Sequence, residues 1–211
     1  MKKNNHLPIS VESSIGRVDV LRYDLSIKFE LKIRSELHKL GCQITCGPGC
    51  HWCCYHPILI SILEGIIIYR WLVGNGKLTL ELRNRLKDTA KQQFETSMEI
   101  LVLSLIPCPF LCDTKCSIYP TRPLICRAYY AVSDPHYCHP HRLNNETTII
   151  NREPIVDSFN IEQRKILRRH KLRLLEIPIG AAILIGERVC NEKIDLDTVD
   201  TLILKEYGSQ A

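Results

Sequence analysis

The chain has 211 residues, of which 45% are apolar and 24% are charged, so it is long enough to bury the core of one compact domain. The net charge of +5 is small and aromatic residues make up only 7%, which favours a solvated surface over a nucleic-acid site. No apolar stretch follows the N-terminal lysines, and the longest apolar run, Pro57 to Val73, contains Glu64 and Arg70. We therefore expect a cytoplasmic protein without a secretion signal or a membrane span.

The spacing of apolar residues predicts a mainly α fold, a helical domain with a loop-rich, cysteine-ligated region that binds a metal or cluster. Helices are expected over 26–40, 57–73, 79–105, 162–175, 180–189 and 197–207. The run from Pro57 is apolar nearly all round, which predicts a buried central helix. Thr79 and Asp197 are the expected N-caps of the helices that they begin. Thr147 to Ile150 is the only run considered as a strand.

This pattern divides the chain into three parts. Residues 1–25 form an N-terminal extension, and residues 26–145 form a metal-binding core that contains the clustered cysteines. Residues 146–211 form a C-terminal helical segment that packs on the core. We expect the parts to make one compact unit.

Eleven cysteines are unusual for a chain of this length in a reducing compartment. Disulfides are rare there, so clustered cysteines more often hold a metal or carry out redox work. Their odd number also does not favour a closed disulfide framework. Cys42 and Cys190 lie outside the clusters and are expected to be free thiols.

The first cluster reads Cys46-Gly-Pro-Gly-Cys50-His-Trp-Cys53-Cys54. The two-residue interval between Cys50 and Cys53 lets two thiolates bind one ion from a tight turn. Neighbouring Cys53 and Cys54 point in different directions in most backbone conformations. They therefore fit a polynuclear cluster, or two adjacent ions, better than a single ion.

The second cluster lies in a segment, residues 107–140, that holds six prolines and no sustained helical period. Such a composition predicts a loop-rich region that a metal organises. Its five cysteines are Cys108, Cys112, Cys116, Cys126 and Cys138. Buried structural cysteines are usually scattered along a chain, so two dense groups favour a metal centre over apolar packing.

The sequence CPFL at Cys108–Leu111 and the sequence CSIYPTRPLICR at Cys116–Arg127, together with the first cluster, resemble the bacterial cysteine-cluster proteins with zinc- or iron-chelating domains. They also resemble the cysteine-rich core of flagellin lysine N-methylases. The resemblance covers roughly Cys46 to Cys138. The ligands that it implies are Cys50, Cys53, Cys54, Cys108, Cys116 and Cys126, with Cys138 matching a further, less regular cysteine.

Two positions depart from the family pattern. Cys46 stands one residue further from the next cysteine than the family's leading cysteine usually does, and Cys112 occupies a place that is usually polar. Both are kept as candidate ligands.

Two arginines and a tyrosine of the second cluster are candidates for tuning the site. Arg122 and Arg127 lie beside cysteines, and a guanidinium can offset accumulated thiolate charge through N–H···S contacts. The alternative for Arg122 is an ordinary surface arginine. Tyr119 is expected to pack over the site or to donate a hydrogen bond.

The number of thiols constrains the metal. A structural zinc takes four ligands, so seven to nine cysteines suit two zinc sites, or one iron–sulfur cluster and another ion. Thiolates select zinc, copper(I) or iron–sulfur over hard cations. We favour an iron–sulfur cluster, with zinc as the alternative, because of the adjacent cysteine pair and the excess of ligands.

Three functions remain open from the sequence. The first is an enzyme, either an iron–sulfur oxidoreductase or a transferase like the lysine N-methylases; no catalytic residue is identified. The second is a non-catalytic module in which zinc staples loops onto helices. The third is a protein-binding role for the basic stretch Arg164 to Arg173, RKILRRHKLR.

Overall fold

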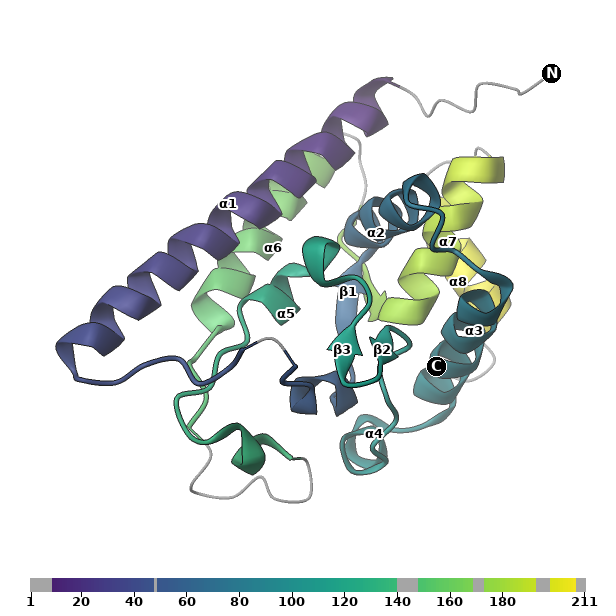
Figure 1. Cartoon of the computed structure of the whole chain (residues 1–211). Helices are drawn as coiled ribbons and strands as arrows, with labels where there is room; N and C mark the ends of the chain where they lie inside the picture. The colour runs from purple at the N-terminus through teal and green to yellow at the C-terminus, as the bar shows by residue number, and fades with distance from the viewer. Residues whose placement is uncertain (1–8, 48, 140–147, 169–172, 193–197, 208–211) are drawn as a thin grey trace.

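The computed structural model describes residues 9–47, 49–139, 148–168, 173–192 and 198–207. The fold is mainly α, as the sequence predicts, with two small two-stranded sheets. A long N-terminal helix, α1 (Ile9–Lys39), runs beside α6 (Glu153–Arg168), and the other helices gather around α2 (Ile62–Gly74) and α7 (Ile179–Glu192) (Figure 1). The cysteine-rich loops lie between these two groups (Figure 1).

The pair α2 and α7 forms the centre of the core. Helix α2 is buried on nearly all sides, which confirms the central helix that the sequence predicts. Glycines let the two backbones approach closely, because a Cβ atom built on Gly65 would lie 2.3 Å from the carbonyl oxygen of Ala182. On the other helix, a Cβ atom on Gly186 would lie 2.9 Å from the amide nitrogen of Ile66. The backbone contact between α2 and α7 thus depends on residues without side chains.

Helix α2 begins later than its apolar run. Residues Leu59–Ser61 form the strand β1, which pairs antiparallel with β4 (Glu176–Pro178) just before α7 begins. Ser61 then caps α2, because its hydroxyl accepts a hydrogen bond from the amide of Glu64 at 3.2 Å. A three-residue strand without alternating polar and apolar residues cannot be distinguished from a buried helix by periodicity, so the sequence did not predict β1.

Helix α1 is much longer than the predicted helix over 26–40, and most of the predicted N-terminal extension belongs to it. Its buried positions include Ile15, Val18 and Ile33 at helical spacing. Arg22 occupies the same face and is only 4% exposed. Because a charged residue stands at a core position, the apolar repeat looks broken in the sequence although the helix continues.

The predicted helix over 79–105 is two helices, α3 (Leu80–Glu95) and α4 (Met98–Leu103). The expected cap is confirmed, because the hydroxyl of Thr79 accepts a hydrogen bond from the amide of Leu82 at 3.1 Å. Extended backbone at Thr96 and Ser97 separates the two helices. The apolar residues of α4 are largely exposed.

Replacing Thr79 with alanine is expected to lower the free energy of unfolding by about 1 kcal/mol, since the first turn of α3 loses its cap. Ser97 begins α4 but makes no side-chain cap hydrogen bond, so Ser97→Ala is the matched control. Urea unfolding of metal-free protein would measure both variants. Equal losses for the two would contradict a specific capping role for Thr79.

The C-terminal helices are α6, α7 and α8 (Val199–Tyr207). Two of these three lie near their predicted positions, whereas α6 begins nine residues before the predicted helix over 162–175 and residues 173–175 are not helical. The expected cap Asp197, Thr147 and part of the basic stretch, residues 169–172, lie outside the described residues. Ile149 of the considered strand makes an isolated antiparallel bridge with Ala131. Among the described helices, none is both long and apolar enough to cross a membrane.

Candidate metal centre

The first cysteine cluster leads into a short 3₁₀ helix, η1 (Trp52–Tyr55), which carries Cys53 and Cys54. Before it, the amide of Cys50 donates to the carbonyl oxygen of Gly47 at 3.0 Å, so the loop turns back on itself. Gly49 has a φ angle of 92°, a conformation that favours glycine. The glycines of the motif therefore serve the turn that presents Cys50.

The second cluster begins with a tight hairpin. Strand β2 (Leu111–Cys112) pairs with β3 (Lys115–Cys116), and the connecting residues Asp113 and Thr114 both have positive φ angles, 44° and 65°. Positive φ at both central residues is the geometry of a two-residue turn that matches strand twist. The hairpin places Cys116 at the end of β3.

The rest of the second cluster carries Cys126. The chain passes through η2 (Tyr119–Thr121) into the four-residue helix α5 (Leu124–Arg127). The two clusters are joined directly, because the amide of Cys108 donates to the carbonyl oxygen of Cys54 at 2.7 Å. Segments more than fifty residues apart thus meet at the site.

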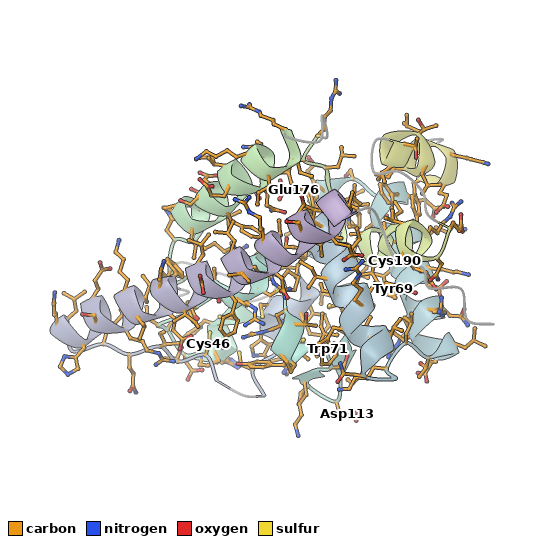
Figure 2. The ribbon with its side chains drawn as sticks, turned by 90° about the horizontal axis from the view of Figure 1, so that it is seen from above. Cys46, Tyr69, Trp71, Asp113, Glu176 and Cys190 are labelled. Carbon is orange, nitrogen blue, oxygen red and sulfur yellow. The ribbon has the colours of Figure 1, made fainter. Side chains whose placement is uncertain are left out.

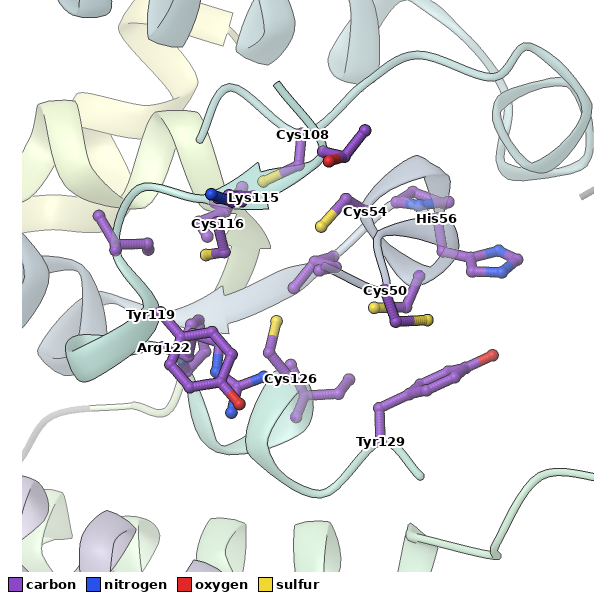
Figure 3. A pocket seen from close by; sticks show the side chains of 18 of the residues that line it. Cys50, Cys54, His56, Cys108, Lys115, Cys116, Tyr119, Arg122, Cys126 and Tyr129 are labelled. Carbon is purple, nitrogen blue, oxygen red and sulfur yellow. The ribbon is translucent and has the colours of Figure 1, made fainter. Parts of the chain in front are cut away.

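A cavity of about 470 Å³ lies where these segments meet. Its thiols are the six that the family resemblance implies as ligands: Cys50, Cys53, Cys54, Cys108, Cys116 and Cys126. Figure 3 shows the sulfurs of Cys54, Cys108, Cys116 and Cys126 surrounding a common space, with Cys50 to one side. We call these four residues the inner thiols. The remaining wall is largely apolar and includes Pro57, Ile58 and Ile179.

The inner thiols surround space rather than one point. Among the described residues, no three histidine, cysteine or acidic side chains stand close enough together to hold a single metal ion. A mononuclear zinc site needs four donors within about 2.3 Å of one centre. Thiolates are the donors of both structural zinc sites and iron–sulfur clusters.

The other candidate ligands lie outside this cavity. The sulfur of Cys46 accepts a hydrogen bond from the amide of Ala131 at 3.1 Å, and it shares a thiol hydrogen bond with Cys50. Cys138 is buried on η3 (Pro135–Cys138), where burial and the nearby charges of Cys46 and Cys50 raise its pKa to about 11. The rings of Trp52 and His139, 4.6 Å apart, pack η1 against η3.

We call Cys46, Cys50, Cys53 and Cys138 the outer thiols, because they interact with one another and only Cys50 and Cys53 reach the cavity. Cys53 stands between the two groups, since it also hydrogen-bonds to Cys54 and lies near Cys126. Cys112 belongs to neither group. Its sulfur accepts a hydrogen bond from the guanidinium of Arg85 at 3.6 Å. Cys42 is exposed, and all eleven cysteines, each within the described residues, are free thiols.

The environment of the thiols is uneven. Burial raises the pKa of Cys108 to about 12 and also raises the pKa of Cys126. The pKa of Cys53 is lowered, first by a hydrogen bond with the thiol of Cys54 and then by the positive charge of Arg122. Cys53 is therefore the thiol most easily deprotonated, while the deepest thiols need a metal to hold them as thiolates.

The three predicted tuning residues have different positions. Arg122 lines the cavity and stacks over the ring of Tyr119, with 3.7 Å between the guanidinium carbon and the ring centre. Tyr119 also lines the cavity but is 50% exposed. Arg127 instead donates from Nε to the carbonyl oxygen of Arg122 at 2.9 Å and from Nη2 to that of Pro120. Its guanidinium is thus engaged with the backbone of the loop.

Several residues at the site were not predicted. Lys115, His56 and Arg152 line the cavity, and Arg152 also stacks on Tyr129 at 4.5 Å. Burial and the charge of Arg152 lower the pKa of His56, which favours a neutral imidazole. His56 lies two residues after Cys54, the last cysteine of the first cluster. Arg152 is far from both clusters in sequence, so no local signal identifies it.

A helical body with two cysteine-rich loops around a thiol-lined cavity defines this chain as a cysteine-rich metal-binding protein. Residues 45–154, more than half of the chain, match the CxxCxxCC family, described as a "Putative zinc- or iron-chelating domain". The chain belongs to this family, and the predicted resemblance is confirmed. No curated protein and no solved structure matches the chain.

Proposed function

We propose that the chain binds an iron–sulfur cluster through the inner thiols, Cys54, Cys108, Cys116 and Cys126. The observation that carries this proposal is the arrangement of these four sulfurs around one cavity of about 470 Å³. Four cysteine thiolates are the usual ligand set of such a cluster. The family's zinc- or iron-chelating character agrees with this donor chemistry.

The cavity also offers room and charge for chemistry beside a cluster. When bound through four thiolates, an iron–sulfur cluster would supply electron transfer. The protein supplies a largely apolar wall and the cations Arg122 and Arg152, which offset the negative charge of the thiolates. We propose redox or group-transfer chemistry at this place, in a cytoplasmic protein; a lysine N-methylase-like transfer is one form of it.

The outer thiols support a second metal. Cys46, Cys50, Cys53 and Cys138 are also four, and a structural zinc takes four thiolates. A zinc ion there would tie η3 to the loop before η1. The non-catalytic alternative, a zinc-stapled module that binds a protein partner, places zinc in both groups.

Metal analysis of protein purified without oxygen tests the proposal. We expect a brown protein with absorption near 400 nm, as iron–sulfur clusters show, and with iron and acid-labile sulfide in equal amounts. Zinc in addition would fill the outer thiols. A colourless protein that contains zinc and no iron would overturn the cluster and favour the zinc-stapled module.

A further inference from the structure

Arg22 on α1 reaches into the second cysteine cluster although it lies outside the matched family region. Its side chain is only 5% exposed. From Nη1 it donates to the carbonyl oxygens of Thr121 at 2.9 Å and of Arg122 at 3.2 Å. Nη2 donates to Oδ1 of Asp19 at 2.5 Å and to the Thr121 hydroxyl at 3.4 Å. One guanidinium therefore binds two successive carbonyl groups of the loop.

Glu64 on α2 holds the same loop from the other side. It is 4% exposed, and Oε1 accepts a hydrogen bond from the amide of Leu124 at 2.9 Å. Leu124 begins α5, so Glu64 takes the place of a cap at this helix. The amides of Cys126 and Arg127 then bond to the carbonyl oxygen of Pro123.

Together the two charged side chains hold the backbone of residues 121–124. Arg122, which lines the cavity, belongs to this stretch, and the inner thiol Cys126 follows it by two residues. Two further contacts join α1 to the chain just after this stretch. The Tyr130 hydroxyl donates to Glu30 at 3.1 Å, and the guanidinium of Arg127 lies over the ring of Tyr23. The position of Cys126 is thus set by residues of α1 and α2.

We propose that Arg22 and Glu64 are positioning residues of the metal centre, which hold the loop so that Cys126 and Arg122 face the cavity. This inference rests on the proposed function. Ionisable side chains are costly to bury, and Arg22 and Glu64 offset that cost through bonds to the loop backbone rather than to each other. Partners that orient metal ligands commonly contribute about 10- to 100-fold to metal affinity.

The first test uses metal-free protein, so it does not depend on which metal binds. Arg22→Met and Glu64→Leu are compared with Lys32→Met, which removes an exposed lysine of α1 that pairs with Glu36. We expect faster amide hydrogen exchange at residues 121–128 in the first two variants, and exchange at the wild-type rate in the control. Unchanged exchange in Arg22→Met and Glu64→Leu would overturn the inference.

The second test uses iron-loaded protein. We expect the half-life of the visible absorption under a chelator to fall about 10-fold in Arg22→Met and Glu64→Leu. Glu64→Gln keeps an oxygen that can accept from Leu124, so it should restore most of the half-life. The double variant Arg22→Met/Glu64→Leu should shorten the half-life at least as much as either single variant, because the two side chains hold different backbone groups of the loop. A wild-type half-life in folded Arg22→Met and Glu64→Leu protein would mean a purely structural role and would overturn the inference.

The two tests separate the two proposals. Wild-type protein that takes up no iron would overturn the proposed cluster. The exchange experiment would still test whether Arg22 and Glu64 hold the loop. Wild-type protein that binds iron, with variants that bind it equally well, would overturn only the positioning role.

Discussion

Cys126→Ser is expected to remove the iron–sulfur cluster from protein purified without oxygen. Cys126 is one of the four inner thiols. Serine has a hydroxyl group in place of the thiol, and this group stays protonated at neutral pH, so it does not replace the thiolate as a ligand of iron. We expect a larger effect than the loss of a residue that only orients a ligand, which lowers metal affinity about 10- to 100-fold. Iron and sulfide assays with visible absorption, normalised to folded protein, would measure it.

Two other cysteines provide matched controls for this loss. Cys42 is exposed, and the sulfur of Cys112 accepts a hydrogen bond from Arg85 outside the cavity. Cys42→Ser and Cys112→Ser should therefore contain as much iron as wild type. Cys54→Ser should behave like Cys126→Ser. Retention of full iron by Cys54→Ser or Cys126→Ser would contradict the assignment of the inner thiols.

The second large effect is expected at Gly65 in the central helix. Gly65→Ala should lower the free energy of unfolding by about 3 kcal/mol, because the new methyl group would meet the carbonyl oxygen of Ala182, 2.3 Å away. A backbone carbonyl inside a packed helix cannot move aside as a flexible side chain can. Helices α2 and α7 would have to separate, which opens the centre of the core (Figure 2 shows the packed side chains around it).

Gly16 offers the matched control for the same substitution. It lies in α1, and a Cβ atom there would have no neighbour within 4 Å. Gly16→Ala should therefore stabilise the protein by about 0.5–1 kcal/mol through helix propensity. Urea unfolding of both variants without metal gives the comparison. Equal stabilisation by Gly65→Ala would show that the two helices do not pack as closely as described.

The cavity thiols were predictable because the family resemblance that implies them rests on local sequence motifs. All six that the motif implies line one cavity, including Cys50 and Cys108, which lie far apart in the chain. Which sulfurs face each other was not predictable, since that depends on the short elements η1 and α5. Cys46 and Cys112 differ in their surroundings for the same reason, although both look like candidate ligands in the sequence.

The supporting charges were harder to read from the sequence. Glu64 was visible as an interruption in an apolar run, which is the pattern that a buried carboxyl group leaves. Arg22 lay in a stretch predicted as an extension, because it breaks the apolar spacing of α1 at the point where the helix meets the loop. Arg22 thus obscures the helix that carries it, whereas the long apolar run around Glu64 still predicts α2.

The hydrogen bond from the amide of Cys108 to the carbonyl oxygen of Cys54 joins the two cysteine clusters through main-chain atoms. Helices α2, α3 and α4 lie in the chain between them, so ordering these helices shortens the flexible length that has to be closed. The two clusters are thus joined by the chain itself, in addition to any metal that their thiols hold.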